Sequence, residues 1–336
     1  MNDLTNGALL GLAVGDALGT TYEFDRIDQP SYPTLATGPA DDVVGGGPFG
    51  LAPGQVTDDT QLAVCLARSL ADCHRLNIDD VARRYVVWAE HAFDIGNQTA
   101  AAIRRLRDGV PPDRAGHDVW LASGKRAAGN GSLMRTAPIA VALMTAPAAE
   151  VIRAAIADSM ITHADPRCAL ACAAFDLAIA TRCAADPRIP VPFSHVARAA
   201  LQAGAEQLRA AWPDDRTEID RAEADLSRDL DAADSPDPGV YLPETDLLRT
   251  AGFVRVAFRL AFWHVAHTET WRAAVIDVAS RGGDADTNAA IVGALVGARD
   301  GTRGIPEAWR ERVLVATEPG PAEWAEAHHP KYLLMM

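Results

Sequence analysis

Two stretches of the sequence place several oxygen-bearing side chains directly before an apolar segment. They read G-Q-V-T-D-D-T-Q (54–61) and S-R-G-G-D-A-D-T-N (280–288). The side chains concerned are Thr57, Asp58, Asp59, Asp284, Asp286 and Thr287. Acidic and hydroxyl side chains are favoured at helix N-termini, where an oxygen accepts hydrogen bonds from free N–H groups. One cap uses one side-chain oxygen, so each stretch supplies more oxygens than capping needs.

The surplus carboxylates could instead bind metal ions. Carboxylates that are brought together repel one another and raise one another's pKa unless a cation lies among them. Hard divalent cations bind carboxylate, hydroxyl and water oxygens. If the two stretches meet in the fold, they could hold two ions about 3.5–4 Å apart. From spacing alone, capping and metal binding explain the pattern equally well.

Three further stretches contain residues that could do chemistry. Glu23 ends a small-residue segment, G-D-A-L-G-T-T-Y-E-F (15–24), and Asp94 lies among the turn residues of F-D-I-G-N-Q-T (93–99). Taken singly, Glu23 reads as a solvated acid and Asp94 as a helix cap. The third stretch, A-G-N-G-S-L-M-R (128–135), has glycines before a predicted helix, and its backbone N–H groups would suit a phosphate. Since no Gly-Lys-Ser/Thr follows, it is not a Walker loop.

The elements that must position these residues are predicted to be helices. Apolar residues recur at three- and four-residue steps, and alternating strand patterns are missing, so we predict an all-α fold. The predicted helical ranges are 60–73, 79–92, 131–144, 148–161, 166–183, 194–211, 250–267, 271–280 and 286–299. Asp165 followed by Pro166 indicates the start of one helix.

The composition excludes several classes of protein. The chain has 336 residues, 49% of them hydrophobic, and a formal net charge of −14. That charge argues against binding along DNA or RNA, and leaves open a small anionic ligand or a basic protein partner. Five cysteines without a C-x-x-C pair indicate free thiols in a reducing compartment. The group His163, Cys168 and Cys172 fits no common zinc spacing.

We expect one domain over residues 1–336, in a cytoplasmic monomer. The apolar run 7–15 is cut short by Asp16 and has no basic residue before it, so it is neither a signal peptide nor a membrane span. Residues 36–54 and 184–192 read as loops. The acidic segment 213–246 is interpreted as an insertion made of a short exposed helix and a loop.

Taken together, the motifs resemble those of the ADP-ribosylglycohydrolase family. They are G-x-x-x-G-D-A-L-G-x-x-x-E-F, T-D-D-T, F-D-I-G-N-x-T, G-N-G-S-L-M-R, T-H-A-D-P and G-G-D-A-D-T-N, and they run in the family's order from Gly11 to about Gly297. The resemblance is strongest to the bacterial branch that includes ADP-ribosyl-[dinitrogen reductase] hydrolase. It implies a compact multi-helix orthogonal bundle whose cleft holds two divalent cations, Mg²⁺ or Mn²⁺.

The resemblance also implies roles for individual residues. The metal ligands would be Thr57, Asp58, Asp59, Asp284, Asp286 and Thr287, and the catalytic residues Glu23, Asp94, Asp59 and Asp284. The residues that bind ADP-ribose would be Asn130, Gly131, Ser132, His163, Phe253 and Gly283. Of these, Asn130, Gly131 and Ser132 would lie along the ribose and diphosphate, with His163 nearby, and Phe253 would stack on adenine. Either Glu23 or Asp94 would act as the general base.

The implied activity is metal-dependent removal of ADP-ribose from a modified protein, with the arginine linkage favoured. Two alternatives stay open from the sequence. One is hydrolysis of another ADP-ribosyl linkage, to serine, polymer, nucleic acid or a small molecule. The other is a non-catalytic protein that binds ADP-ribose or gives immunity to a toxin. The expected partners are an ADP-ribosylated protein and ADP-ribose itself, with neither membrane nor nucleic acid.

Overall fold

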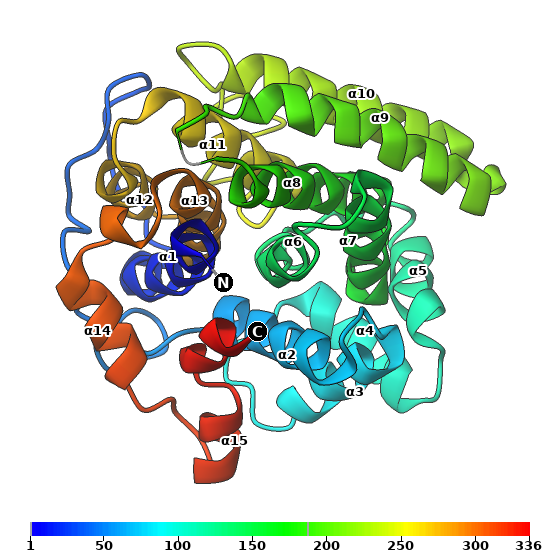
Figure 1. Ribbon diagram of the computed structural model, residues 1–336, viewed down its shortest axis with the longest axis horizontal. Helices are drawn as coiled ribbons and strands as arrows, with labels where there is room; N and C mark the ends of the chain where they lie inside the picture. Colours follow the sequence, from blue (N-terminus) through cyan, green and yellow to red (C-terminus); the bar gives the residue numbers. More distant parts are fainter. Residues whose placement is uncertain (1, 187) are drawn as a thin grey trace.

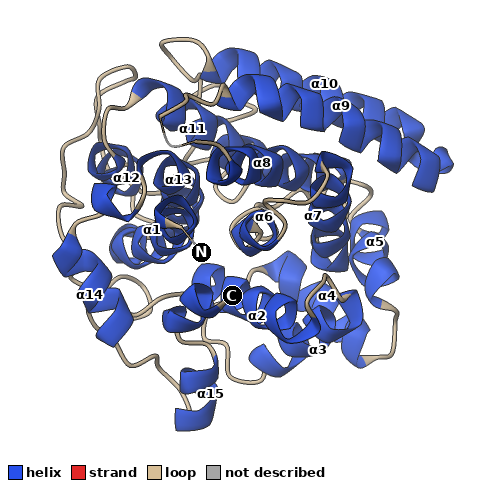
Figure 2. Ribbon diagram, in the orientation of Figure 1, coloured by secondary structure: helices blue, strands red, loops and turns tan. Residues whose placement is uncertain are grey.

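The computed structural model describes residues 2–186 and 188–336, and the regular structure of these residues is helical (Figure 2). Within them, β-structure is limited to three isolated bridges. The prediction of an all-α protein is therefore confirmed. None of the helices in the described ranges is long and apolar enough to span a membrane.

Fifteen α-helices and four short 3₁₀ helices make up the described regular structure (Figure 1). The α-helices are α1 (Asp3–Gly19), α2 (Asp58–Cys73), α3 (Ile78–Trp88), α4 (Asn97–Arg107), α5 (Pro112–Ala122), α6 (Ala137–Ala142), α7 (Ala148–Thr162), α8 (Pro166–Ala184), α9 (Phe193–Ala211), α10 (Arg216–Ala233), α11 (Val254–His267), α12 (Trp271–Ser280), α13 (Ala285–Asp300), α14 (Glu307–Val315) and α15 (Ala322–Ala327). The 3₁₀ helices are η1 (Thr20–Tyr22), η2 (Pro213–Asp215), η3 (Thr302–Gly304) and η4 (Pro330–Met335).

Some helix boundaries that were predicted from the sequence agree with the structure, and others do not. α8 begins at Pro166 as predicted, and the Asp165 side chain accepts a hydrogen bond from the N–H of Arg167. The predicted helix over 131–144 is shorter, because residues 131–135 form turns and only Ala137–Ala142 are helical. The predicted helix over 250–267 begins at Val254, since Gly252 has a positive φ of 79°.

Helix α1 was not predicted from the sequence, because the periodic spacing of apolar residues is visible only in a helix that also has a polar face. Every residue from Gly7 to Gly19 is buried, so apolar and small residues surround the whole helix. Its neighbour α13 is likewise buried from Ala285 to Ala298. Figure 1 shows the two helices side by side near the middle of the molecule, both viewed nearly end-on.

Glycines on α1 allow the backbones of α1 and α13 to touch. They recur at every fourth position, as Gly7, Gly11, Gly15 and Gly19, and so share one face. A Cβ atom at Gly11 would lie 2.1 Å from the carbonyl oxygen of Gly293, and one at Gly19 would lie 2.3 Å from that of Ala285. The two helices run antiparallel, so the C-terminal end of α1 meets the N-terminal end of α13.

The acidic segment 213–246 differs from the prediction of a short exposed helix. Its helix α10 is 18 residues long and contacts α8, α9 and α11. Its buried apolar side chains are Ile219, Ala222, Leu226, Leu230 and Ala233. They are spaced by three or four residues, which forms a stripe toward the core between the acidic positions. The high charge of the segment concealed this stripe.

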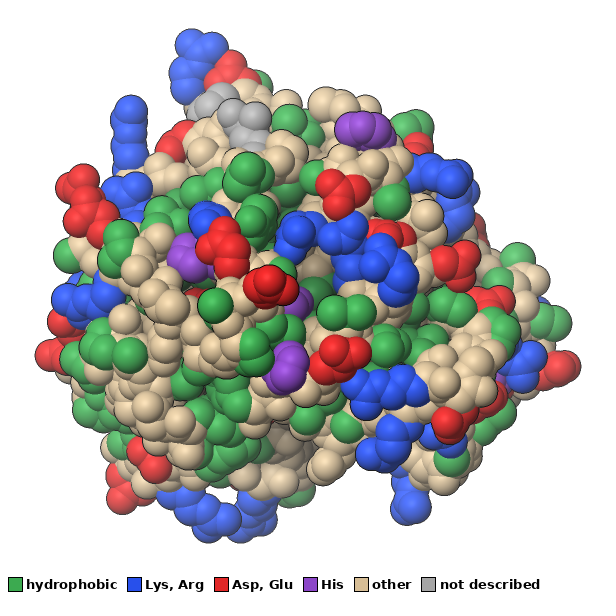
Figure 3. All heavy atoms as spheres, turned by 90° about the horizontal axis from the view of Figure 1, so that it is seen from below, with side chains coloured by type: hydrophobic (Ala, Val, Ile, Leu, Met, Phe, Trp, Pro, Cys, Tyr) green, Lys and Arg blue, Asp and Glu red, His purple; other side chains and the backbone are tan. Residues whose placement is uncertain are grey.

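Charged side chains of both signs are mixed on the surface. On the face shown in Figure 3, Lys and Arg side chains lie among Asp and Glu side chains, and neither sign of charge covers it. Surface ion pairs account for part of this mixing. Arg198 contacts both Asp231 and Asp234 at 2.9 Å, for example. Such exposed pairs contribute little to stability.

We predict that Gly11→Ala destabilises the protein by about 3 kcal/mol, because the new methyl group meets backbone atoms of α13 that cannot move aside. Gly204→Ala is the matched control. Gly204 also lies inside a helix, but its Cβ would meet the end of the Leu170 side chain at 2.9 Å, which can shift. Denaturant unfolding should place Gly204→Ala within about 1 kcal/mol of wild type. Equal effects of the two substitutions would contradict the close helix contact.

Candidate active site

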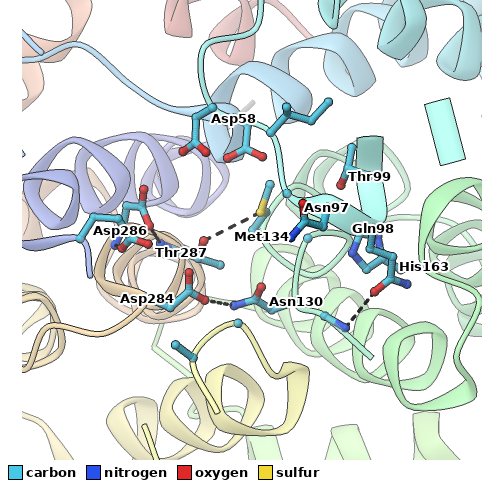
Figure 4. Close-up of a pocket in the computed structure, with 18 of the residues that line it drawn as sticks. Asp58, Asn97, Gln98, Thr99, Asn130, Met134, His163, Asp284, Asp286 and Thr287 are labelled. Atoms are coloured by element: carbon cyan, nitrogen blue, oxygen red, sulfur yellow. Dashed lines mark hydrogen bonds between the residues drawn. The ribbon is translucent and has the colours of Figure 1, made fainter. Parts of the chain in front are cut away.

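The N-terminal ends of α2 and α13 meet at a cleft of about 480 Å³. Five acidic residues line it, namely Glu23, Asp58, Asp94, Asp284 and Asp286. Polar side chains from other segments complete the lining, among them Gln98, Thr99, Asn130, His163 and Thr287. Figure 4 shows Asp58 facing Asp284 and Asp286 across the cleft. Residues more than 200 positions apart in the chain are thus brought together.

The N-terminus of α2 is capped by a residue from another helix. Asp16 of α1 is wholly buried, and its carboxylate accepts hydrogen bonds from the backbone N–H groups of Thr57 and Thr60 at 3.1 Å. The hydroxyl groups of the same threonines donate to it at 2.8 and 2.5 Å. Thr57 occupies the N-cap position, but its side chain makes no capping hydrogen bond. Since Asp16 supplies the cap, Asp58 and Asp59 are not needed for it.

The N-terminus of α13 is capped in the same way. The Glu23 carboxylate accepts hydrogen bonds from the N–H groups of Ala285 at 2.6 Å and Asp286 at 3.3 Å. Asp284 occupies the N-cap position without a side-chain capping bond. Glu23 follows η1, which directly continues α1, so one short segment supplies both caps. Simple capping by the loop aspartates is therefore not what the structure contains.

The carboxylates at the two helix starts, together with those of the capping residues, lie close enough to one another to share cations. One oxygen each from Asp16, Asp59 and Asp286 lies within 4.8 Å of the others, and the same holds for Glu23, Asp284 and Asp286. The hydroxyl of Thr57 lies 3.2 Å from an Asp59 oxygen and 3.4 Å from an Asp286 oxygen. The second Asp59 oxygen is buried and makes no hydrogen bond within the described residues.

Burial and mutual repulsion disfavour the charged forms of these acids. Burial is the main cause that raises the pKa of Asp59 well above its usual value, and the charges of Asp286 and Asp16 add to it. Burial likewise raises the pKa of Glu23, with contributions from Asp286 and Asp284. The pKa of Asp16 rises only to about 6, because its four hydrogen bonds from Thr57 and Thr60 oppose the effect of burial.

Asp58 and Asp94 lie at the cleft outside these two groups. Asp58 is buried, and burial together with the charge of Asp94 raises its pKa well above the usual range. Asp94 is half-buried in the turn before α4, and burial raises its pKa to about 7, with smaller contributions from Asp16 and Asp284. Its carboxylate makes no hydrogen bond within the described ranges, so it is available to a ligand.

The loop 128–134 forms another wall of the cleft. The side-chain amide of Asn130 donates to Asp284, and its backbone N–H donates to the carbonyl of Gly252 at 2.9 Å. The N–H groups of Gly131 and Ser132 have no partner among the residues that the structure describes. The Ser132 side chain points away into the core, where its hydroxyl lies 2.9 Å from that of Ser159. Asn130 thus links this loop to the acidic cluster.

His163 is buried beside this loop. Its Nδ1 lies 2.8 Å from the hydroxyl oxygen of Thr162, which accepts a hydrogen bond from Arg135 at 2.9 Å. Burial, with the nearby charge of Arg135, lowers the pKa of His163 well below its usual value, so the ring is neutral. A Cβ at Gly131 would lie 2.8 Å from this ring, so the position requires glycine.

Phe253 and Gly283 lie beside the cleft but are not among its lining residues. Phe253 precedes α11 and pairs with Gly129 in an isolated bridge. Its ring is half-buried between the guanidinium groups of Arg167 at 5.4 Å and Arg255 at 6.0 Å. Gly283 has a φ of 72°, and its N–H donates to the carbonyl of Asp25 at 2.9 Å. Both residues support segments that form the cleft.

The sequence profile of the ADP-ribosylglycohydrolase family matches residues 2–328. The chain belongs to this family. Similarity to individual proteins supports this assignment. The chain is 30% identical over 322 residues to ADP-ribosylarginine hydrolase Tri1 of Serratia proteamaculans, covering 93% of this chain and 75% of the relative. It is 28% identical over 322 residues to ADP-ribosyl-[dinitrogen reductase] glycohydrolase of Rhodospirillum rubrum, covering 95% and 92%.

A solved structure of an ADP-ribosylglycohydrolase-related protein complex extends the likeness to the fold. It superposes with a TM-score of 0.65 at 27% identity, and the match covers 99% of this chain and 98% of that chain. The predicted family and its helical fold type are therefore confirmed. The predicted metal-ligand set, with Glu23, Asp94, Asn130, Gly131 and His163, lies at or directly behind one cleft of this family member.

One residue of the cluster was missed as a site residue. Asp16 was interpreted only as the end of an apolar run, yet it lies in the same group as Asp59 and Asp286. The signal was present, because Asp16 is the only charged residue between Asp3 and Glu23. A single carboxylate inside an otherwise apolar helix is costly unless it has a specific partner. Its partners, Thr57 and Thr60, are visible only in the folded chain.

Asp59→Asn should stabilise the metal-free protein by about 1–3 kcal/mol at pH 8, because it removes a buried charge from among like charges. The unfolded chain loses the Asp59 proton near pH 4, whereas the folded metal-free chain keeps it to higher pH. The contribution of Asp59 to the stability of the wild-type protein therefore becomes less favourable as pH rises above about 4, and the advantage of Asp59→Asn should vanish below that pH. Chemical unfolding in excess EDTA across this pH range measures the difference.

Asp108→Asn serves as the control, since Asp108 is an exposed acid at the end of α4. It should change the free energy of unfolding by less than about 0.5 kcal/mol at any pH. Adding Mg²⁺ or Mn²⁺ should stabilise wild type and reverse the order of wild type and Asp59→Asn. An Asp59→Asn variant that is less stable than wild type in EDTA at pH 8 would contradict the repulsion.

Proposed function

We propose that the protein hydrolyses the bond between ADP-ribose and an arginine side chain of a modified protein. One observation carries the proposal. Asp16 and Glu23 cap α2 and α13, so the aspartates of both helix starts converge on a cleft, and of these only Asp286 accepts from an N–H group of a helix start, that of Thr287 at 2.7 Å. Relatives named ADP-ribosylarginine hydrolase and ADP-ribosyl-[dinitrogen reductase] glycohydrolase support the choice of reaction and linkage.

The donor set fits two divalent cations, either Mg²⁺ or Mn²⁺. The carboxylates are buried and close together, one Asp59 oxygen lacks any partner among the described residues, and hydroxyl oxygens lie between them. The residues that would hold the ions are Thr57, Asp58, Asp59, Asp284, Asp286 and Thr287, with Asp16 directly behind them. Divalent ions bound there would offset much of the negative charge of the acids. They would also lower the pKa of a bound water and orient the ribose hydroxyl groups.

Asp94 is the better placed of the two candidate bases. Both Glu23 and Asp94 line the cleft, but Glu23 uses an oxygen to hold the start of α13. In the proposed reaction the water oxygen forms a bond to C1″ of the ribose while the bond from C1″ to the guanidine nitrogen breaks. Asp94 takes one proton from the water, and this proton ends on the leaving guanidine nitrogen, so that Asp94 is ionised again. The buried carboxylates stabilise the positive charge that develops on the ribose.

Backbone donors and a neutral histidine would hold the rest of ADP-ribose. The free N–H groups of Gly131 and Ser132 are adjacent, which suits the oxygens of a diphosphate. The neutral ring of His163 lies beside the same loop, with Nε2 close to Gly131. Binding an anion by neutral donors avoids bringing Lys or Arg into the acidic cleft. The modified protein would then be recognised through its ADP-ribosylated arginine.

The proposal predicts release of ADP-ribose from a peptide modified on arginine, in Mg²⁺ or Mn²⁺ but not in EDTA. Asp94→Asn should lower kcat by about 10²- to 10⁴-fold, the range for loss of a general base, with the thermal unfolding midpoint kept. Chromatography of released ADP-ribose measures turnover. A parallel panel of serine-linked and polymeric ADP-ribose defines the linkage, and the arginine peptide should have the highest kcat/KM.

Asp108→Asn is the matched control, because it makes the same chemical change on an exposed helix end. Its kcat should equal that of wild type. Folded wild-type protein that releases no ADP-ribose from the arginine peptide in either metal would overturn the proposed function. Faster release from a serine-linked peptide would overturn the arginine linkage alone.

A further inference from the structure

Phe24 is an exposed aromatic residue in a strained backbone conformation at the cleft. Its side chain is 66% exposed, and the residue lines the cleft directly after Glu23. Its φ angle is 65°, in the left-handed region that normally favours glycine or asparagine. An exposed ring adds little to the core, and a bulky residue at this φ carries a steric cost. Folding alone gives no reason for phenylalanine at this position.

The backbone at Phe24 is fixed by the same contacts that place the acidic cluster. The N–H of Phe24 donates to the carbonyl of Gly283 at 2.7 Å, and the N–H of Gly283 donates to that of Asp25 at 2.9 Å. Arg26 pairs with Gly282 in an isolated bridge. The turn is therefore held by main-chain hydrogen bonds, which any residue at position 24 could make. The Phe24 ring itself is left for another purpose.

The position of Phe24 assigns it to one end of the cleft. Figure 4 shows Asp58, Asp284 and Asp286 toward one side, with Gln98 and His163 toward the other. Phe24 adjoins Glu23, whose carboxylate lies with Asp284 and Asp286, so it belongs to the acidic end. In the proposed function the diphosphate lies along the loop at Gly131. The group beyond the bond that breaks, the modified arginine, then leaves past the acidic end.

We propose that the Phe24 ring is the platform on which the guanidinium group of the modified arginine stacks, so that Phe24 selects a cationic acceptor. This inference rests on the proposed function. A guanidinium group is planar, weakly hydrated and positively charged, and it is attracted to the face of an aromatic ring. The neighbouring carboxylates favour the same charge. An uncharged acceptor, such as a serine side chain, gains neither interaction.

Substitutions of Phe24 can remove the aromatic ring while the backbone turn at this position is kept. Phe24→Asn removes the ring and relieves the left-handed backbone, so its thermal unfolding midpoint should equal or exceed that of wild type. Its kcat/KM on the arginine-modified peptide should fall about 3- to 30-fold. Its Kd for free ADP-ribose, measured by calorimetry, should stay within about twofold, because ADP-ribose lacks the acceptor. Phe24→Trp should keep kcat/KM near wild type, since tryptophan also offers a π-face.

His74→Asn is the matched control. His74 has a φ of 55°, ends α2 and is exposed away from the cleft, so asparagine relieves a similar strain there. It should be at least as stable as wild type, with kcat/KM unchanged. The proposal is overturned if Phe24→Asn hydrolyses the arginine peptide like wild type, or if its affinity for ADP-ribose falls by the same factor as kcat/KM. Wild-type protein inactive on that peptide would refute the proposed function together with this inference, whereas the first two outcomes refute this inference alone.

Discussion

The capping of α2 and α13 by carboxylates from the segment Asp16–Glu23 is the interaction on which the cleft depends. A helix start leaves backbone N–H groups that need acceptors. In most helices a residue at the start of the same helix supplies the acceptor. Here Asp16 supplies it for α2 and Glu23 for α13. Because Asp16 and Glu23 supply the caps, the aspartates at the N-termini of α2 and α13 are not needed as N-caps. Both caps belong to α1 and the segment that continues it, so they also hold the two N-termini at a fixed distance.

Capping by Asp16 and Glu23 in turn requires the close contact of α1 with α13. Gly19 allows the last turn of α1 to approach Ala285, the first residue of α13. Larger side chains there would separate Glu23 from the N–H groups that it caps. The hydrogen bonds between Phe24 and Gly283 continue the contact beyond the helices. Packing and chemistry are thus linked, because the small-residue face of α1 sets the geometry of the acidic cluster.

The acids of the cleft differ from several other buried acids that have arginine partners. Asp158, Asp229 and Asp277 are buried with arginine partners, and the hydrogen bonds and charges of His264 and Arg281 lower the pKa of Asp277 to about 2 despite its burial. Within the described residues, Asp59 and Asp286 have no Lys or Arg ion pair at all. A buried carboxylate without a cation is costly, so the clustered carboxylates of the cleft reduce the stability of the metal-free protein. Metal binding would recover it.

The sequence by itself determined the helical class, the start of α8 at Pro166 and the aspartates at the starts of α2 and α13, because each depends on local composition or spacing. Periodicity failed for α1, which has no polar face, and for α10, whose charges mask its apolar stripe. Only the tertiary structure decided that Asp16 and Glu23 cap the two helices and that Phe24 is exposed beside them. Those facts rest on contacts between segments up to 262 residues apart, whose distances no local pattern specifies.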